Sequence, residues 1–239
     1  MTDIKKFKMK GIFDSLARNY DLANTIMSLG MHHYWRKFAV AKTGLKHGGI
    51  ALDLCCGTGM ITADLAERTG PEGRVTGMDL SGEMLAVARQ RLSKRGLAGR
   101  VELVQGDVAV LPFAVDSFDC VTIGYGLRNV HDPGRVLGEI QRVLKPGGLV
   151  VAIESAKPTL PLFRGAYYTY LKNWVPLVGR ILCHNQPAYR YLYDSIVDFP
   201  APSKIADLFR RSGFDAVEYF PLTWGVIAVF RGWKANKNF

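Results

Sequence analysis

The chain has 239 residues, 48% of them hydrophobic, and carries a net charge of +10 with an isoelectric point near 9.5. This length and apolar content are enough for one large domain, with or without a cap. The positive charge favours an anionic partner, such as an acidic membrane surface or an acidic small molecule. Nucleic acid is not expected as a partner, because no recognised nucleic-acid motif accompanies the charge. No run of about 18 uncharged apolar residues occurs, so no segment is expected to span a bilayer.

The cysteines show neither a zinc-binding spacing nor a disulfide framework, and the first ten residues lack the apolar core of a signal peptide. We therefore expect a reducing, cytoplasmic location and no metal site. The cysteines are Cys55, Cys56, Cys120 and Cys183.

Residues 1–47 carry apolar side chains at roughly helical spacing. They are expected to form two or three helices that make an N-terminal cap. Polar residues interrupt the apolar pattern and are candidates for either structural or functional roles: Tyr20, Asn24, His32 and His33.

Residues 50–59, with the sequence IALDLCCGTG, read as a buried parallel strand that runs into a Gly-x-Gly turn. Gly57 and Gly59 lack a Cβ, so the backbone can turn sharply there and approach a ligand. The helix that follows, at about 60–69, points its N-terminal amides at the same place. This pattern predicts the first strand-to-helix turn of an open nucleotide-binding sheet.

Acidic residues follow the next two strands, which are predicted at 74–78 and 101–105. Asp79 lies about twenty residues past the glycine turn, where a carboxylate accepts hydrogen bonds from a ribose diol. Asp107 can accept a hydrogen bond from an exocyclic amine such as that of adenine, and Val108 offers its backbone amide. Ser81 is predicted to cap a helix that ends near residue 96.

A fourth strand at 118–123 leads into the sequence GYGLRNVH at 124–131. Two glycines, an arginine and an asparagine at the carboxyl end of a strand favour a site over a purely structural loop. A helix from Asp132-Pro133 to about 144 follows, then a turn at 145–148 and a fifth strand at 149–154.

Residues 157–202 are rich in tyrosine, tryptophan and phenylalanine, with arginine and lysine interspersed. This insert is read as a helical lid, as a surface that touches a membrane, or as both. A last helix, capped by Ser203, and strands at 215–220 and 224–230 complete the chain. Only Pro221-Leu222-Thr223 joins these strands, which predicts a hairpin and one antiparallel strand.

The order of elements resembles the α/β fold of class I S-adenosylmethionine-dependent methyltransferases, which is Rossmann-like. It predicts a seven-stranded, mostly parallel sheet with one antiparallel strand and a helical cap. The chain would then divide into a cap at 1–47 and a methyltransferase domain at 48–239. The alternative is a nicotinamide-binding domain, whose glycine motif needs a third glycine where Thr62 stands.

Five segments together resemble the ubiquinone/menaquinone biosynthesis C-methyltransferases of the UbiE type, and the resemblance covers nearly the whole chain. The family usually has Met where this chain has Ala23, and Ser where it has Ala156. The segments are YDLANTIMS at 20–28 with HHYW at 32–35, DLCCGTG at 53–59, GLRNV at 126–130, RVLKPGG at 142–148 continuing to Glu154, and YLYDSI at 191–196 continuing to Phe199-Pro200.

The resemblance implies methyl transfer from S-adenosylmethionine to a ring carbon of demethylmenaquinol, giving menaquinol. It implies that Tyr20, Arg128 and Asn129 hold the ring hydroxyl, with Arg128 stabilising the oxyanion. His131 and His32 are alternative proton acceptors. The expected cofactor-binding residues are Asp53, Gly57, Gly59, Thr62, Asp79, Asp107, Val108 and Gly124.

Three alternatives stay open from the sequence. The enzyme could also methylate a ubiquinone precursor, 2-methoxy-6-polyprenyl-1,4-benzoquinol, or it could act on another small molecule or lipid. A non-catalytic protein that binds the nucleoside is a hypothesis of a different class. Transient contact with the inner face of the cell membrane is expected, because the acceptor carries a polyprenyl tail. The oligomeric state is open, with a homodimer as one option.

Overall fold

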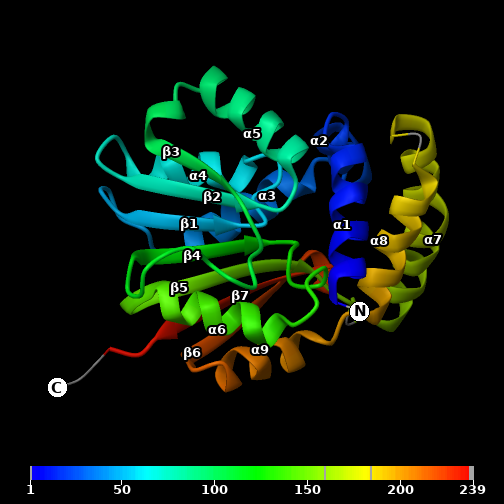
Figure 1. The fold of residues 1–239 in the computed structure, drawn as a ribbon. Helices are drawn as coiled ribbons and strands as arrows, with labels where there is room; N and C mark the ends of the chain where they lie inside the picture. The colour runs from blue at the N-terminus through cyan, green and yellow to red at the C-terminus, as the bar shows by residue number, and fades with distance from the viewer. Residues whose placement is uncertain (1, 159, 184, 237–239) are drawn as a thin grey trace.

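The computed structural model describes residues 2–158, 160–183 and 185–236, and within them seven strands form one sheet (Figure 1). The order of the strands is β3-β2-β1-β4-β5-β7-β6, and β7 runs antiparallel to both of its neighbours. The predicted sheet, with its single antiparallel strand, is therefore confirmed. The strands are β1 Ile50–Leu54, β2 Arg74–Asp79, β3 Val101–Gln105, β4 Phe118–Gly124, β5 Leu144–Ser155, β6 Phe214–Leu222 and β7 Ile227–Lys234.

The fifth strand differs from the prediction at its start. It begins at Leu144, and the expected turn at 145–148 lies inside it as an irregular stretch. Gly147 has a left-handed φ of 74°, and the register with β4 shifts between Phe118 and Cys120. β5 therefore pairs with β4 on both sides of this irregular stretch, at Leu144 and from Leu149 onward.

Two groups of helices cover the two faces of the sheet. One hydrophobic cluster joins β1 and β2 to α3 (Met31–Lys42), α4 (Met60–Thr69) and α5 (Gly82–Lys94). A second cluster lies against the other face and includes α6 (Pro133–Val143) and α9 (Pro202–Arg211). The central strands β1 and β4 are mostly buried, which explains why apolar residues dominate their sequences.

The helix caps agree with the sequence in two cases and differ in one. The Ser81 side chain accepts from the amide of Met84, and Asp132 accepts from the amide of Arg135. The predicted cap at Ser203 is wrong, because the N-cap is Ala201, two residues earlier, and α9 begins at Pro202. Proline suits the first helical position, where an N–H would have no partner.

Four further helices gather at the carboxyl ends of the parallel strands (Figure 1). They are α1 (Thr2–Leu16), α2 (Tyr20–Met27), α7 (Pro161–Cys183) and α8 (Gln186–Asp198). In the figure, α1 stands between the sheet and the α7–α8 pair. The helices α7 and α8 pack closely because Gly179 has no Cβ, and a Cβ there would lie 2.0 Å from the Tyr189 ring.

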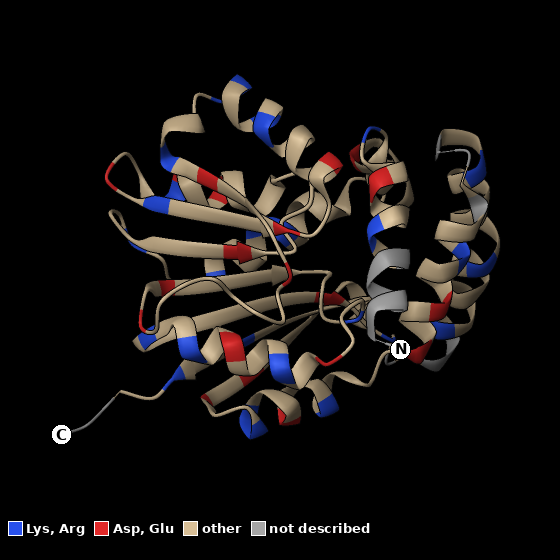
Figure 2. Ribbon diagram, in the orientation of Figure 1, with Lys and Arg blue, Asp and Glu red and all other residues tan. Residues whose placement is uncertain are grey.

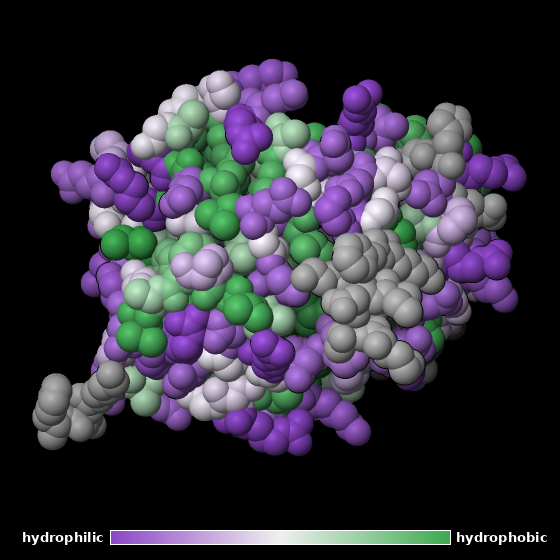
Figure 3. Space-filling model, in the orientation of Figure 1, coloured by the Kyte–Doolittle hydropathy of each residue, from purple (hydrophilic) through white to green (hydrophobic). Residues whose placement is uncertain are grey.

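On the face shown in Figure 3, the outline of the molecule is mostly hydrophilic, while hydrophobic atoms gather near its centre. None of the helices in the described ranges combines the length and the apolar character that crossing a bilayer requires.

Candidate active site

Two cavities meet at the carboxyl ends of β1 and β4. The smaller has a volume of about 380 Å³ and the larger about 580 Å³. A sheet of this type binds ligands at this edge, where the strand order reverses between β1 and β4. Seven residues line both cavities and form the wall they share: Phe13, Tyr20, Cys55, Gly57, Gly124, Tyr125 and Asn129.

The smaller cavity contains the acidic residues that the sequence predicted. Asp79, Asp107 and Val108 line it, together with Gly57 from the first strand-to-helix turn. Asp79 accepts from the amide of Gly57 at 2.8 Å and from the amide of Ser81 at 2.9 Å. Burial raises the pKa of Asp79, although these amides oppose the rise. The carboxylate is thus fixed in place at the tip of β2.

The two glycines of the first turn have different roles. Gly57 has a φ of 53°, and a Cβ built there would meet nothing within 4 Å, so its backbone faces open space. Gly59 lines neither cavity. A Cβ on Gly59 would lie 2.9 Å from the Ala88 side chain of α5, so this glycine allows α4 and α5 to pack closely.

Asp53 lies fully buried at the end of β1 and borders the larger cavity. Its two carboxylate oxygens accept from the hydroxyls of Thr62 at 2.6 Å and Thr122 at 2.7 Å. Burial raises the pKa of Asp53 to about 7 despite these bonds. Thr62 itself lines neither cavity, so the structure places it behind Asp53.

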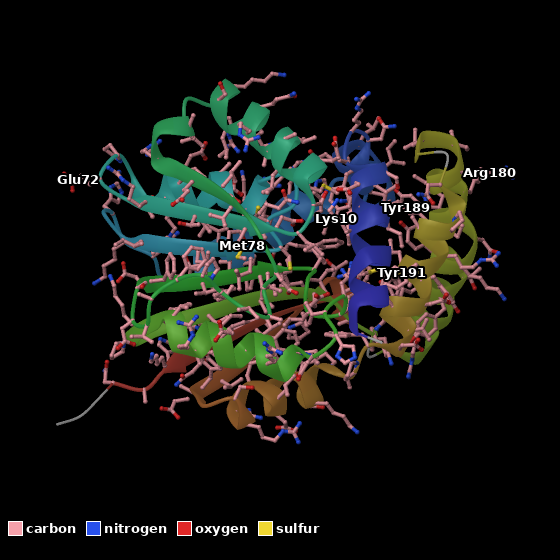
Figure 4. All side chains as sticks on the ribbon, in the orientation of Figure 1. Lys10, Glu72, Met78, Arg180, Tyr189 and Tyr191 are labelled. Atoms are coloured by element: carbon pink, nitrogen blue, oxygen red, sulfur yellow. The ribbon has the colours of Figure 1, made fainter. Side chains whose placement is uncertain are left out.

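The larger cavity is enclosed mainly by apolar and aromatic side chains of the helical cap and of α7 and α8. All three predicted catalytic residues, Tyr20, Arg128 and Asn129, border it. Tyr189 and Tyr191 lie on α8 (Figure 4), and the Tyr189 ring packs against Gly179 of α7. Other wall residues include Leu16, Met27, Leu29, Phe163, Tyr167, Tyr170, Leu171, Val175, Leu192 and Ile196.

Arg128 is held by a buried carboxylate. Its Nη1 lies 2.5 Å from Oε2 of Glu154, and both side chains are almost wholly inaccessible. Burial works against the charged guanidinium, but the Glu154 carboxylate raises the pKa of Arg128 overall. The Nε–H of Arg128 is buried and finds no acceptor among the described residues. In the described part of the chain, a buried donor of a charged group is therefore left without an acceptor beside the cavity that Arg128 lines.

Asn129 connects the loop after β4 to α8. Its amide nitrogen donates to the carbonyl of Tyr125 at 3.0 Å, and its oxygen accepts from the hydroxyl of Tyr191 at 3.1 Å. Sequence reasoning gave no role to Tyr191 or Glu154, although both fall in segments that resemble the family. Their spacing from Arg128 and Asn129 along the chain gives no sign of these contacts.

Tyr20 is positioned by its neighbour Asp21, which ties α2 to the first strand-to-helix turn. Asp21 accepts from the Thr58 hydroxyl at 2.8 Å and forms an ion pair with Arg91 of α5. Arg91 also donates to the carbonyl of Thr58. Burial raises the pKa of Tyr20, although Arg128 opposes the rise, so the phenol stays protonated at neutral pH.

The two histidines that the sequence offered as proton acceptors lie in different places. His131 is exposed and borders the smaller cavity, whereas His32 borders the larger one with Arg128. The Ser28 hydroxyl donates to the carbonyl of Asn24 at 2.6 Å. Its oxygen is then free to accept from Nδ1–H of His32, 2.8 Å away. This leaves the lone pair on His32 Nε2, which is buried and unpartnered among the described residues.

Comparison with known proteins agrees with this geometry. The model of the ubiE/COQ5 methyltransferase family matches residues 1–234. A demethylmenaquinone methyltransferase of Lactococcus lactis is 44% identical over 237 residues, covering 99% of this chain and 94% of the relative. A ubiquinone/menaquinone biosynthesis C-methyltransferase of Hydrogenovibrio crunogenus is 40% identical, and the match covers 95% of this chain and 89% of the relative.

Solved structures show the same fold at low sequence identity. A SAM-dependent methyltransferase from Thermotoga maritima superimposes with a TM-score of 0.66 at 20% identity, covering 95% of this chain and 99% of that one. A SAM-dependent methyltransferase from Aquifex aeolicus superimposes with a TM-score of 0.59 at 18% identity, covering 83% of this chain and 88% of that one. The fold is therefore that of the SAM-dependent methyltransferases, and the nicotinamide-binding alternative is not supported. With a family match across nearly all of its length, the chain belongs to the ubiE/COQ5 methyltransferase family.

Proposed function

We propose that the protein transfers a methyl group from S-adenosylmethionine to a ring carbon of demethylmenaquinol, producing menaquinol. The observation that carries this proposal is the junction of an acid-lined cavity with a larger apolar one beside Arg128. The names of the Lactococcus lactis relative and others like it support the choice of acceptor.

The smaller cavity fits a nucleoside with a ribose diol. Asp79 is the acceptor for the two ribose hydroxyls, and Asp107 with the amide of Val108 suits an adenine edge. The space next to Gly57 is open, and Gly124, which has no side chain, lines the smaller cavity. Together they leave room for the methionine part of the cofactor. In this proposal, Gly59 and Thr62 act indirectly, by packing α4 on α5 and by orienting Asp53.

When bound, S-adenosylmethionine supplies a methyl group already activated by its positive sulfur. The protein must then mainly align the acceptor, exclude water and stabilise charge on the acceptor. The ring carbon becomes a good nucleophile when the neighbouring hydroxyl loses its proton. The Arg128 guanidinium, which borders the large cavity, is a suitable donor to the resulting oxyanion, because Glu154 fixes its position.

Tyr20 and Asn129 hold the acceptor from the shared wall. The Tyr20 hydroxyl is protonated at neutral pH and can donate to a ring oxygen. Asn129 is oriented by Tyr125 and Tyr191, so its side chain is already held when the acceptor arrives.

His32 is the better placed of the two candidate proton acceptors. It borders the same cavity as Arg128, and its lone pair on Nε2 is unpartnered among the described residues. Burial lowers its pKa to about 4, so the ring is neutral at pH 7 and its lone pair is free, but the low pKa makes it a weak base. Arg128 does not serve as the base, since its pKa is raised.

A tailed acceptor also explains the apolar walls, and it places the substrate in a bilayer before it binds. We therefore infer that the protein works in transient contact with the inner face of the cell membrane. Homodimer formation stays a prediction.

The experiment is a comparison of acceptors. Purified protein receives methyl-labelled S-adenosylmethionine with either demethylmenaquinol or 2-methoxy-6-polyprenyl-1,4-benzoquinol, and products are identified by mass spectrometry. Ring methylation of demethylmenaquinol supports the proposal, and methylation of both acceptors identifies a dual enzyme. Cofactor binding without methylation of either quinol would refute the proposal and favour a different acceptor or a non-catalytic role.

A further inference from the structure

Helix α7 carries one apolar stripe that is covered at one end and exposed at the other. Successive residues of the stripe are four and then three positions apart in turn, so they lie along one side of the helix. The first three line the large cavity, while the last three are exposed by 43%, 36% and 60%. In order, the stripe consists of Phe163, Tyr167, Tyr170, Trp174, Leu177 and Ile181.

Helix α2 lies antiparallel beside this stripe, as two hydrogen bonds show. At one end the side-chain amide of Asn19 donates to the carbonyl of Leu182 at 2.7 Å. At the other, the hydroxyl of Tyr170 donates to the carbonyl of Met27. The segments between these bonds therefore run side by side, and Leu22 of α2 is itself 54% exposed.

Leu29 extends the same surface to the cavity. It follows α2, it is 85% exposed, and it also lines the large cavity, so it marks the rim. Its φ of 50° is unusual for leucine, so the backbone holds an apolar side chain outward at some cost in strain. We call Leu22, Leu29, Trp174, Leu177 and Ile181 the α2–α7 patch. An exposed group of large apolar side chains on this scale indicates a binding surface.

Helix α7, which carries three of the five patch residues, is positively charged. Helix α7 contains Arg164, Lys172 and Arg180 and no aspartate or glutamate. Figure 4 shows Arg180 on the outer side of α7, directed away from the sheet. Figure 2 shows Lys and Arg residues along the outer side of the α7–α8 pair. Within the described ranges, Arg180 and Lys172 form no ion pair with a carboxylate.

We propose that the α2–α7 patch docks on the surface of an anionic lipid bilayer and that the α7 stripe leads the acceptor's tail from the lipid into the large cavity. This rests on the proposed function for the identity of the cargo. Tryptophan and aliphatic side chains enter the interface while cations of the same helix, Arg180 among them, meet acidic headgroups, which is the usual arrangement for a helix lying on a membrane. The apolar stripe of α7 runs from the exposed Ile181 to Phe163 at the cavity. This connection to the cavity distinguishes the α2–α7 patch from a chance exposure of apolar groups.

The test is flotation of the full chain with vesicles of phosphatidylglycerol and phosphatidylcholine in equal parts, and with vesicles of phosphatidylcholine alone. Ile181→Glu is the test variant and Leu177→Glu an independent second. Val115→Glu is the matched control, because Val115 is 61% exposed on the β3–β4 connection, against 60% for Ile181. All variants are first checked for unchanged S-adenosylmethionine binding, which establishes that they are folded.

The wild type and the control variant are expected to float with anionic vesicles, and both test variants to bind about tenfold less, as expected when one large apolar side chain loses contact with lipid. Equal binding of Ile181→Glu and the wild type, or no binding of the wild type, would overturn the proposal. So would a lipid-free dimer that Ile181→Glu converts to a monomer, because a second copy would then cover the patch.

Methylation assays separate this proposal from the proposed function. With a water-soluble, short-tailed demethylmenaquinol, Ile181→Glu should retain wild-type turnover, while turnover of the long-tailed acceptor in vesicles should fall about tenfold with membrane binding. Equal turnover of the vesicle-bound acceptor by both proteins would contradict the docking surface alone. Absence of methylation in the wild type with either acceptor would refute the function and leave the flotation result standing.

Discussion

The Arg128 guanidinium and the Glu154 carboxylate form a buried ion pair, with Nη1 of the arginine 2.5 Å from Oε2 of the glutamate. Glu154 is on β5, and Arg128 is in the loop after the adjacent β4, so two neighbouring strands position the group that faces the acceptor. Glu154 also approaches the amide of Arg128 at 3.3 Å, and the carboxylate therefore orients both the backbone and the side chain.

Glu154→Ala should strongly destabilise the protein, because it leaves a buried arginine without its counter-charge. The expected loss in the free energy of unfolding is about 3–5 kcal/mol. Denaturant unfolding monitored by circular dichroism measures it. The matched control is Asp207→Ala, which breaks an exposed pair with Arg210 and should cost under about 1 kcal/mol. Similar losses in the two variants would show that the buried pair has no special role.

Arg128→Ala should lower turnover far more than it weakens S-adenosylmethionine binding. Removing one preorganised donor to a developing oxyanion costs about 100-fold to 1,000-fold in turnover. Steady-state kinetics and calorimetry give the two quantities separately. Unchanged turnover would remove Arg128 from the mechanism, and an equal loss in both quantities would assign it to cofactor binding.

Asp79→Ala should weaken cofactor binding, since a fixed, buried carboxylate is lost from the smaller cavity. Hydrogen bonds to charged groups contribute about 1.5–3 kcal/mol, so the dissociation constant should rise by at least tenfold. Adenosine gives a sharper test than the whole cofactor, because it lacks the methionine part. An unchanged affinity for adenosine by calorimetry would refute the ribose assignment.

Binding of S-adenosylmethionine should become tighter as the pH rises from 6 to 8. Burial raises the pKa of Asp53 to about 7, so below that pH much of this carboxyl is protonated. A cationic cofactor favours the ionised form, and binding then releases a proton. Calorimetry at pH 6.5 in buffers with different ionisation enthalpies measures that release. The neutral thioether product should release fewer protons, and equal release by both ligands would contradict the role of the positive sulfur.

Stability should fall as the pH drops from about 6.5 toward 4, in part because of His32. Its folded pKa of about 4 lies below the ordinary 6.5, so protons bind the unfolded state first. The contribution of neutral His32 to the free energy of unfolding is therefore present above pH 6.5 and is lost as the pH falls toward 4. His32→Gln should flatten the pH dependence of the free energy of unfolding in this window. His131→Gln is the control, because that side chain is exposed, and equal flattening by both variants would contradict the assignment.

The sheet was largely predictable from the sequence, because its signals are local. Strands bounded by glycine turns, an acid at the tip of β2 and a short final link all depend on neighbouring residues. The start of β5 was not predictable, since residues 145–148 read as a turn, and the pairing of Leu144 with Phe118 before them is a tertiary contact.

The site was predictable only in part, because its remaining contacts join residues far apart in the chain. Glu154 meets Arg128 across two strands, and Tyr191 reaches Asn129 from α8. Gly59 and Thr62 fit the pattern of cofactor ligands, yet the structure turns one toward Ala88 and the other toward Asp53. Spacing along the chain places a residue at the end of a strand but does not give the direction of its side chain.

The account depends most on the junction of the two cavities at Tyr20 and Asn129. A crystal structure with S-adenosylhomocysteine and demethylmenaquinol tests it directly. The nucleoside should lie in the smaller cavity with its ribose on Asp79, its sulfur should face the shared wall, and the quinol ring should lie beside Arg128 with the tail along α7. A nucleoside in the larger cavity, or a quinol ring that does not reach the shared wall, would contradict the account.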